Sequence, residues 1–226
     1  MEFLNYAFMQ RALLAGTIIG IICPLVGSFL ILKRLSMIGD ALAHISMSGI
    51  ALGLIIGTNP TFTALITASL ASLLIDFLRK NFKKYDELSI AIIMAAGLGL
   101  GIVLISIGGS STSNVMSYLF GSIIAISTLD LVVISLVALF VFSITILLYN
   151  KLFFLTFDEE AAKIRGMRVE TINILFLLLT SMTIVVSIKI TGILLTSALI
   201  TLPVACGLQL GKSFRNTTLL SIFFAE

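Results

Sequence analysis

The sequence predicts an all-α membrane protein: one helical bundle over residues 1–226, with about seven complete spans and a partial eighth. Composition is the first reason, because 59% of the residues are hydrophobic and 11% are charged, whereas soluble domains carry about a quarter charged residues. The length of the apolar stretches is the second reason. Each runs for about twenty residues, which is the length that a helix needs to cross a hydrocarbon core.

Charged residues and turn signals bound the apolar stretches and so define the expected spans. The complete spans are expected at residues 12–32, 35–57, 61–78, 88–108, 129–149, 171–188 and 190–210. Residues 117–127 are apolar but too few to cross, so we expect a re-entrant or interfacial piece there. A further apolar run starts at Thr217 and stops at Glu226, which predicts a truncated last span.

The basic residues predict the orientation of the bundle. When the seven spans alternate, the basic clusters in the loops all fall on one side, and only Arg11 and Lys189 fall on the other. Lys and Arg near span ends prefer the cytoplasm. The clustered side is therefore expected to be cytoplasmic, with the N-terminus outside.

The longest cytoplasmic loop, at about residues 151–170, contains the stretch "FDEEAAKIRGMRVETIN". Acidic residues from Asp158 to Glu160 come first, Lys163 and Arg165 follow, and Gly166 can adopt a left-handed conformation. This order predicts a short helix whose dipole is complemented by charge at both ends. The helix is either a solvated connector or a rigid docking element for a cytosolic partner.

The stretch "LSMIGDALAHISMSGIALG", residues 35–53, places Asp40 and His44 inside an expected span. At a spacing of four residues they share one helical face, about 6 Å apart. A rise of about 1.5 Å per residue puts Asp40 about 8 Å and His44 about 14 Å inside the cytoplasmic end. Ionisable residues at such depth usually face a bundle interior or a water-filled path.

Two interpretations of this pair remain open. In the first, Asp40 and His44 offer an oxygen and a nitrogen ligand to a passing divalent cation; zinc accepts both, and manganese accepts carboxylate and tolerates imidazole. Two copies of the chain would then supply four groups around a shared axis. In the second, the two side chains pair with each other as a structural clasp. An intramembrane enzyme is disfavoured, because no third ligand or nucleophile accompanies the pair.

Small and helix-bending residues predict how the spans pack. Gly49 and Gly53 lie on one stripe of the second span, where they favour close helix packing and could otherwise line a path. Pro203 is expected to kink the last complete span, because proline removes a backbone hydrogen bond. The hydroxyls of that span, such as Thr196 and Thr201, either line a path or bond to their own helix backbone.

Three stretches, "LSMIGDALAHISMSGIALG", "FDEEAAKIRGMRV" and "TGILLTSALITLPVA", together resemble the permease subunit of ATP-binding-cassette importers for zinc and manganese. The resemblance implies a homodimeric permease in the cytoplasmic membrane of a prokaryote. Its partners would be ATPase subunits and an extracellular metal-binding protein, with no nucleic acid and no bound cofactor. The charged loop would be the coupling helix, which contacts the ATPase through Asp158, Glu160, Ala162 and Gly166.

The same resemblance bears on the cargo. Manganese-type members have a proline where this chain has Ser48, which favours zinc; a manganese or iron importer permease is the alternative, and an ion-coupled secondary carrier is a more distant one. The chain itself is not expected to be an enzyme. Its "GLQLGKS" stretch has three residues between the glycines, where a phosphate-binding loop needs four, so ATP hydrolysis is assigned to a partner.

Overall fold

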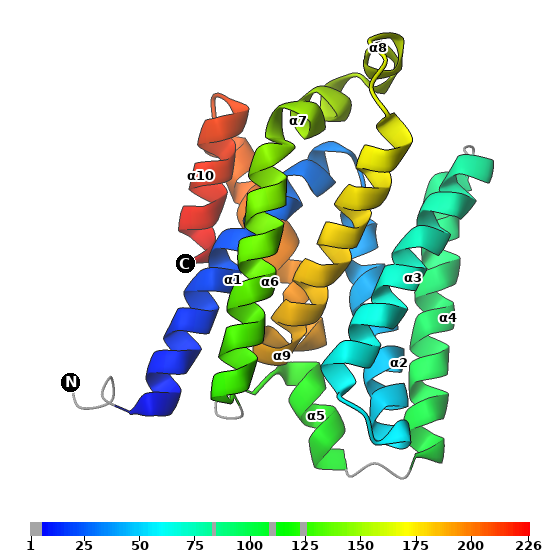
Figure 1. The fold of residues 1–226 in the computed structure, drawn as a ribbon, viewed down its shortest axis with the longest axis vertical. Coiled ribbons are helices and arrows are strands. Elements are labelled where there is room, and N and C mark those ends of the chain that lie inside the picture. The colour runs from blue at the N-terminus through cyan, green and yellow to red at the C-terminus, as the bar shows by residue number, and fades with distance from the viewer. Residues whose placement is uncertain (1–5, 83–84, 109–111, 123–125) are drawn as a thin grey trace.

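The computed structural model describes residues 6–226, apart from 83–84, 109–111 and 123–125. Its helices stand side by side in an upright bundle (Figure 1). In chain order they are α1 (Ala7–Leu32), α2 (Ser36–Ile56), α3 (Pro60–Asn81), α4 (Asp86–Ile107), α5 (Thr112–Phe120), α6 (Thr128–Leu147), α7 (Tyr149–Phe157), α8 (Glu159–Ile164), α9 (Val169–Leu210) and α10 (Phe214–Ala225). We call the end of the bundle that carries α8 the α8 end, and the opposite end the distal end.

The all-helical membrane bundle is confirmed. Within the described residues, six helices are long and apolar enough to cross a membrane: α1, α2, α3, α4, α6 and α9. The first five begin and end within a few residues of the expected spans. The sixth, α9, has 42 residues and covers the last two expected spans, whereas α10 has 12 residues and is shorter than a complete span.

Helix α9 is broken at Gly192, where φ is 78° and ψ is 166°. The yellow first half of α9 descends from the α8 end, and its orange second half returns toward that end (Figure 1). Counted as two spans, the halves give the seven spans that were expected. The boundary was expected next to Lys189, but Lys189 stays helical and the break falls on the glycine, because this region of backbone conformation is open essentially to glycine alone.

Helix α5 packs against the broken part of α9 at the distal end (Figure 1). Gly121 follows α5 with a φ of 75°, and a Cβ placed there would lie 2.8 Å from the backbone nitrogen of Gly192. The nine residues of α5 are too few to cross a membrane, as expected for this segment. Residues 123–125 of the expected re-entrant piece lie outside the described part of the chain.

An ion pair ties the distal end of α6 to α9 near its break. Lys189 donates to Asp130 from three residues before the break. Asp130 also closes a capping box with Ser127 at the start of α6. Both charged side chains are about three-quarters buried, with 26% of Lys189 and 21% of Asp130 exposed. Neutralisation by Asp130 explains why a lysine can lie inside the helix instead of ending it.

We expect Lys189→Met to destabilise the folded protein by about 1–2 kcal/mol, because Asp130 keeps its charge and loses the ammonium that faces it. The measurement is the midpoint of thermal unfolding in detergent. Lys163→Met is the matched control: its ion pair with Glu159 spans 3.4 Å with both side chains more than half exposed, and such pairs contribute about 0.3 kcal/mol. Equal midpoints for the two variants would contradict the proposed contribution.

Burial divides the spanning helices into a central and an outer set. In their most apolar windows, 72% of α2 is buried, against 22% of α4 and of α6. Helices α1 and α9 resemble α2, and together the three form the core.

The hydroxyls of the second half of α9 bond to their own helix: Thr196 donates to the carbonyl of Gly192 at 2.6 Å, and Thr201 to that of Ser197 at 2.9 Å.

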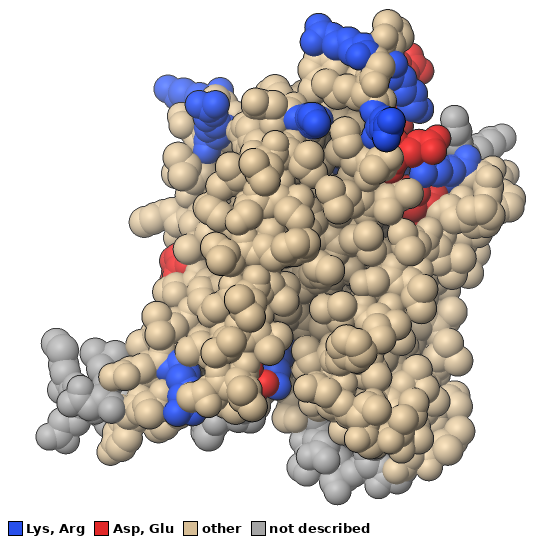
Figure 2. All heavy atoms as spheres, in the orientation of Figure 1, with Lys and Arg blue, Asp and Glu red and all other residues tan. Residues whose placement is uncertain are grey.

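Charge is concentrated at one end of the bundle. Figure 2 shows Lys, Arg, Asp and Glu gathered at the α8 end of this face, above a broad band nearly free of charge. A small group of charges follows at the distal end. This is the distribution expected when a membrane surrounds the middle of the bundle, because charged side chains are costly in hydrocarbon.

Candidate metal site

A rigid corner positions the helix that carries the candidate site. Helix α1 ends in a Schellman motif: the N–H of Leu35 bonds to the carbonyl of Leu30, and the N–H of Arg34 to that of Ile31, both at 2.9 Å. Arg34 has a φ of 58°, in the left-handed region where glycine is usual. Helix α2 then begins at Ser36, so two hydrogen bonds set its starting direction.

Close packing on α3 fixes the second half of α2. A Cβ on Gly49 would lie 2.7 Å from the Cα of Ala64, and one on Gly53 would lie 2.8 Å from the Cα of Pro60. Both glycines therefore face α3 at a distance that no side chain allows. Pro203, the third residue expected to shape packing or path, is buried within the second half of α9.

Asp40 lies in the second turn of α2 and is exposed on the outside of the single chain. Within the described residues it has no hydrogen bond or ion pair. An unpaired carboxylate on the surface of a membrane span is unfavourable in lipid. Its position calls for water, a cation or another protein chain beside this face of α2.

His44 lies one turn further along α2 and is half-buried. Its Nδ1 atom is buried without a hydrogen-bond partner. Asp40 and His44 are both described, yet no hydrogen bond or ion pair joins them. The clasp between these two side chains is therefore absent from the single chain, which leaves an unused nitrogen and an unused carboxylate one turn apart.

The pair alone is an incomplete cation site. No group of three or more His, Cys, Asp or Glu residues that could hold a metal ion occurs in the described part of the chain. Zinc and manganese take four or more ligands. Asp40 and His44 can therefore supply part of a coordination shell, and water or a second chain must supply the rest.

The charged loop forms the expected short helix, α8. Asp158 caps it by accepting a hydrogen bond from the N–H of Ala161 at 2.8 Å, and Gly166 ends it with a φ of 75°. Ala162 is fully buried, so it packs α8 onto the bundle. Glu160 is exposed and borders a hollow between α8 and α3.

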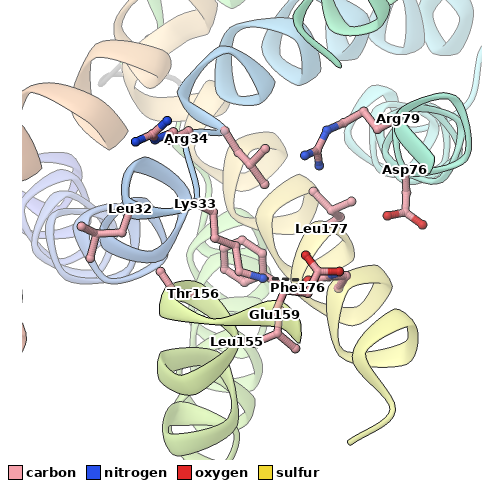
Figure 3. Close-up of a pocket in the computed structure, with 12 residues that line it drawn as sticks. Leu32, Lys33, Arg34, Asp76, Arg79, Leu155, Thr156, Glu159, Phe176 and Leu177 are labelled. Carbon is pink, nitrogen blue, oxygen red and sulfur yellow. Dashed lines mark hydrogen bonds between the residues drawn. The ribbon is translucent and has the colours of Figure 1, made fainter. Parts of the chain in front are cut away.

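A cavity of about 260 Å³ at the α8 end was not expected from the sequence (Figure 3). It lies where the α1–α2 corner, α3, the α7–α8 junction and the start of α9 meet. Inside it, the Nζ of Lys33 donates to the Oδ1 of Asn173 at 2.7 Å. In the sequence, Lys33 indicates only orientation, and Asn173 is a lone amide in an apolar stretch; a contact over 140 residues leaves no local pattern.

An apolar helical bundle, a capped helix protruding from one end and two cation-ligand side chains within a span are features of a membrane permease. The profile of the ABC 3 transport family matches residues 5–226. The chain therefore belongs to the ABC 3 transport family, and the family that the three sequence stretches predicted is confirmed.

Individual relatives agree with this assignment. A probable metal transport system membrane protein of Treponema pallidum is 40% identical over 222 residues, which cover 98% of this chain and 83% of the relative. The manganese import system permease protein ScaB of Streptococcus gordonii is 32% identical, covering 96% of this chain and 78% of the relative. The solved structure of PsaBC from Streptococcus pneumoniae in complex with Fab matches with a TM-score of 0.88 at 28% identity, covering 99% of this chain and 80% of that chain.

Proposed function

We propose that this chain is the membrane permease of an ATP-driven importer for divalent transition-metal cations, with manganese as its cargo. Asp40 and His44 are the ligands that the cation meets inside the membrane. One observation carries this proposal: an unpaired carboxylate lies one turn from a half-buried imidazole whose Nδ1 has no partner. Ionisable residues inside a span usually mark a substrate or ion path, which supports a cation there.

Manganese replaces zinc as the favoured cargo. The ScaB relative is named as a manganese import permease, and a relative in Halalkalibacterium halodurans, 34% identical over 89% of this chain and 69% of its own length, is named as a manganese transport membrane protein. The zinc expectation depended on Ser48. This residue is buried and its hydroxyl donates to the carbonyl of Ile45 at 2.7 Å, so this hydroxyl is engaged by the backbone of α2.

A second copy of the chain completes the proposed site. Asp40 is exposed on the single chain, and the pair needs further ligands. A homodimer that joins the two exposed faces of α2 would bring two carboxylates and two imidazoles together. It would also remove the unpaired carboxylates from lipid, which supports this face as the subunit interface.

The α8 end is proposed to face the cytoplasm, with the N-terminus outside. The basic clusters of the loops gather at this end (Figure 2), as cytoplasmic loops do. Here α8 would receive the ATPase subunits, and an extracellular metal-binding protein would deliver the cation at the distal end. The ion-coupled carrier is disfavoured, because it has no need of a capped helix protruding beyond the membrane.

Vesicles that contain the permease with its ATPase subunits test this function. With the metal-binding protein supplied outside, manganese uptake is expected only when ATP is present on the α8 side. Uptake driven by a proton gradient without ATP would favour the ion-coupled carrier instead. Zinc uptake in place of manganese uptake would restore the zinc preference.

The docking role of α8 has its own test. Gly166→Pro is expected to abolish co-purification of the ATPase, because proline requires a φ near −65° and residue 166 has a φ of 75°. Glu160→Arg should have the same effect by reversing the charge of an exposed side chain. Glu87→Arg, at an exposed position in the first turn of α4, is the matched charge reversal and should leave the complex intact. Co-purification that survives both α8 changes would contradict the docking role.

A further inference from the structure

Lys33 makes two contacts that tie the α1–α2 corner to α9, and it shares a cavity with a carboxylate of α8. Its Nζ donates to Asn173 of α9 and lies 5.2 Å from the centre of the Phe176 ring. Glu159 of α8 lines the same cavity, and its carboxylate attracts the ammonium. Figure 3 shows the Lys33 side chain lying along the Phe176 ring, with Glu159 beside it. A cation over an aromatic face is attracted by it, more strongly when water is excluded.

The aromatic side of this contact leads to α7, the helix that precedes α8. The ring of Phe176 meets that of Phe29 with centroids 6.3 Å apart, and Phe29 meets Tyr149 of α7 at 5.8 Å. Phe29 and Phe176 are both almost fully buried. Packed rings of this kind transmit displacement, because a close-packed core has little free space to absorb it.

The α1–α2 corner, which contains Lys33, is as rigid as the packed rings. Lys33 is the C-cap residue of α1, within the Schellman motif, and α2 begins three residues later. The two hydrogen bonds of this motif leave little freedom between the Lys33 backbone and the first turn of α2. Asp40 lies in the next turn, so a movement of the corner moves the proposed ligand.

We propose that Lys33 is a positioning residue for the metal ligands. It holds Asn173 and Phe176 at the start of α9, the helix that follows α8 in the chain, and so makes the corner and α2 follow the movement of α8. ATP-driven movement of α8 then reaches Asp40 and His44 through the ammonium of one half-buried lysine. This inference depends on the proposed function as an ATP-driven permease, and it adds the link between the helix that faces the ATPase and the metal ligands.

The charge of Lys33 gives this link a pH dependence. Burial lowers the pKa of Lys33 to about 8, an effect opposed by Glu159 of α8 and Asp76 of α3 and reinforced by Arg79 of α3. The charged contacts are therefore complete below about pH 8 and are lost as the pH rises through that value. Folding stability follows the opposite direction, because a lowered lysine pKa means that the fold favours the neutral amine.

The test uses the assembled transporter in vesicles and measures cations transported per ATP hydrolysed. Lys33→Met should reduce this ratio about tenfold while assembly and ATP hydrolysis persist, since residues between coupled sites change a coupling by about 0.5–2 kcal/mol. Asn173→Leu should reduce it similarly. Lys212→Met is the matched control: Lys212 is exposed between α9 and α10, and it has no hydrogen bond or ion pair among the described residues.

The pH profile separates coupling from folding. In the wild type the ratio should fall about fivefold between roughly pH 7 and pH 9, while the unfolding midpoint does not fall. Lys33→Arg should keep the ratio high across this range, because arginine stays charged. The same decline in Lys33→Arg as in the wild type would overturn the inference, and so would a wild-type ratio in Lys33→Met. A wild-type complex that transports no cation at any pH would instead refute the proposed function.

Lys33→Met could also fail to assemble, so hydrogen exchange of the permease alone gives an independent measurement. The amides of the first turns of α2 should exchange faster in Lys33→Met than in the wild type, and Lys33→Arg should restore their protection. Unchanged exchange in Lys33→Met would show that Lys33 does not hold the corner, and would overturn the inference without any transport measurement.

Discussion

Asp40→Asn is expected to abolish ATP-driven manganese uptake while leaving the permease folded and assembled with its ATPase. The change removes the charge but keeps the size of the side chain. Uptake per complex should fall by about a hundredfold or more, because losing even a residue that supports a metal ligand costs about 10–100-fold. Stability should not fall, since Asp40 has no partner among the described residues and is exposed on the single chain.

The measurement is manganese uptake in reconstituted vesicles, divided by the amount of assembled transporter. Glu87→Gln is the matched carboxylate-to-amide control, because Glu87 is exposed at the α8 end and outside the proposed path. A purely structural role for Asp40 predicts the reverse result: less assembled protein, with normal uptake by each complex that remains. Wild-type uptake per complex would end the ligand hypothesis.

His44→Gln distinguishes the two candidate cargoes at the same site. Imidazole suits zinc better than manganese, whereas carboxylate oxygen suits manganese. Loss of the imidazole should therefore reduce any zinc uptake more than manganese uptake. Equal losses for both cations would indicate that His44 positions the site and does not itself bind the cargo.

Gly192→Ala is expected to destabilise the protein by about 3 kcal/mol or more. An alanine at 192 would need a φ of 78° and a ψ of 166°, a region that costs a non-glycine residue about 1–3 kcal/mol. Its Cβ would also lie 2.5 Å from the carbonyl carbon of Phe120, with the backbone of Gly121 still nearer. Backbone cannot move aside as a flexible side chain can. The end of α5 should therefore be pushed away from α9, and their packing should be lost.

The chain itself provides a way to follow this unfolding. It has no tryptophan but has one buried and one exposed cysteine, Cys23 and Cys206. In a Cys206→Ser background, a thiol-reactive fluorophore reaches Cys23 only when the bundle opens. Gly99→Ala is the matched control, because a Cβ there meets nothing within 4 Å and α4 accepts alanine readily. Similar unfolding midpoints for the two variants would contradict the role of the Gly192 break.

The sequence by itself determined the spans, the short charged helix and the shared face of the candidate ligands. Each depends on a local rule. A membrane requires about twenty apolar residues wherever a helix crosses, α8 needs only a capping Asp158 and a terminal Gly166, and a spacing of four residues places Asp40 and His44 on one side of any helix. The family resemblance depended on the same short stretches.

Only the tertiary structure decided where α9 breaks and that α5 packs against the break. The expected boundary used the charge of Lys189, but Asp130 neutralises that charge from a helix 59 residues away in the chain. Gly192 becomes the break because the backbone after α5 approaches it too closely for any side chain. Such an approach between two segments has no signature in either segment alone.

The exposure of Asp40 and the contact of Lys33 with Asn173 also came from the tertiary structure. Periodicity shows that a residue lies on a particular face of a helix, but the neighbours of that face depend on how the whole bundle packs. Asp40 faces outward because α3, α4 and α9 cover other sides of α2. Lys33 meets Asn173 because α1 and α9 pack together, and the free energy of that packing is shared among side chains far apart in the sequence.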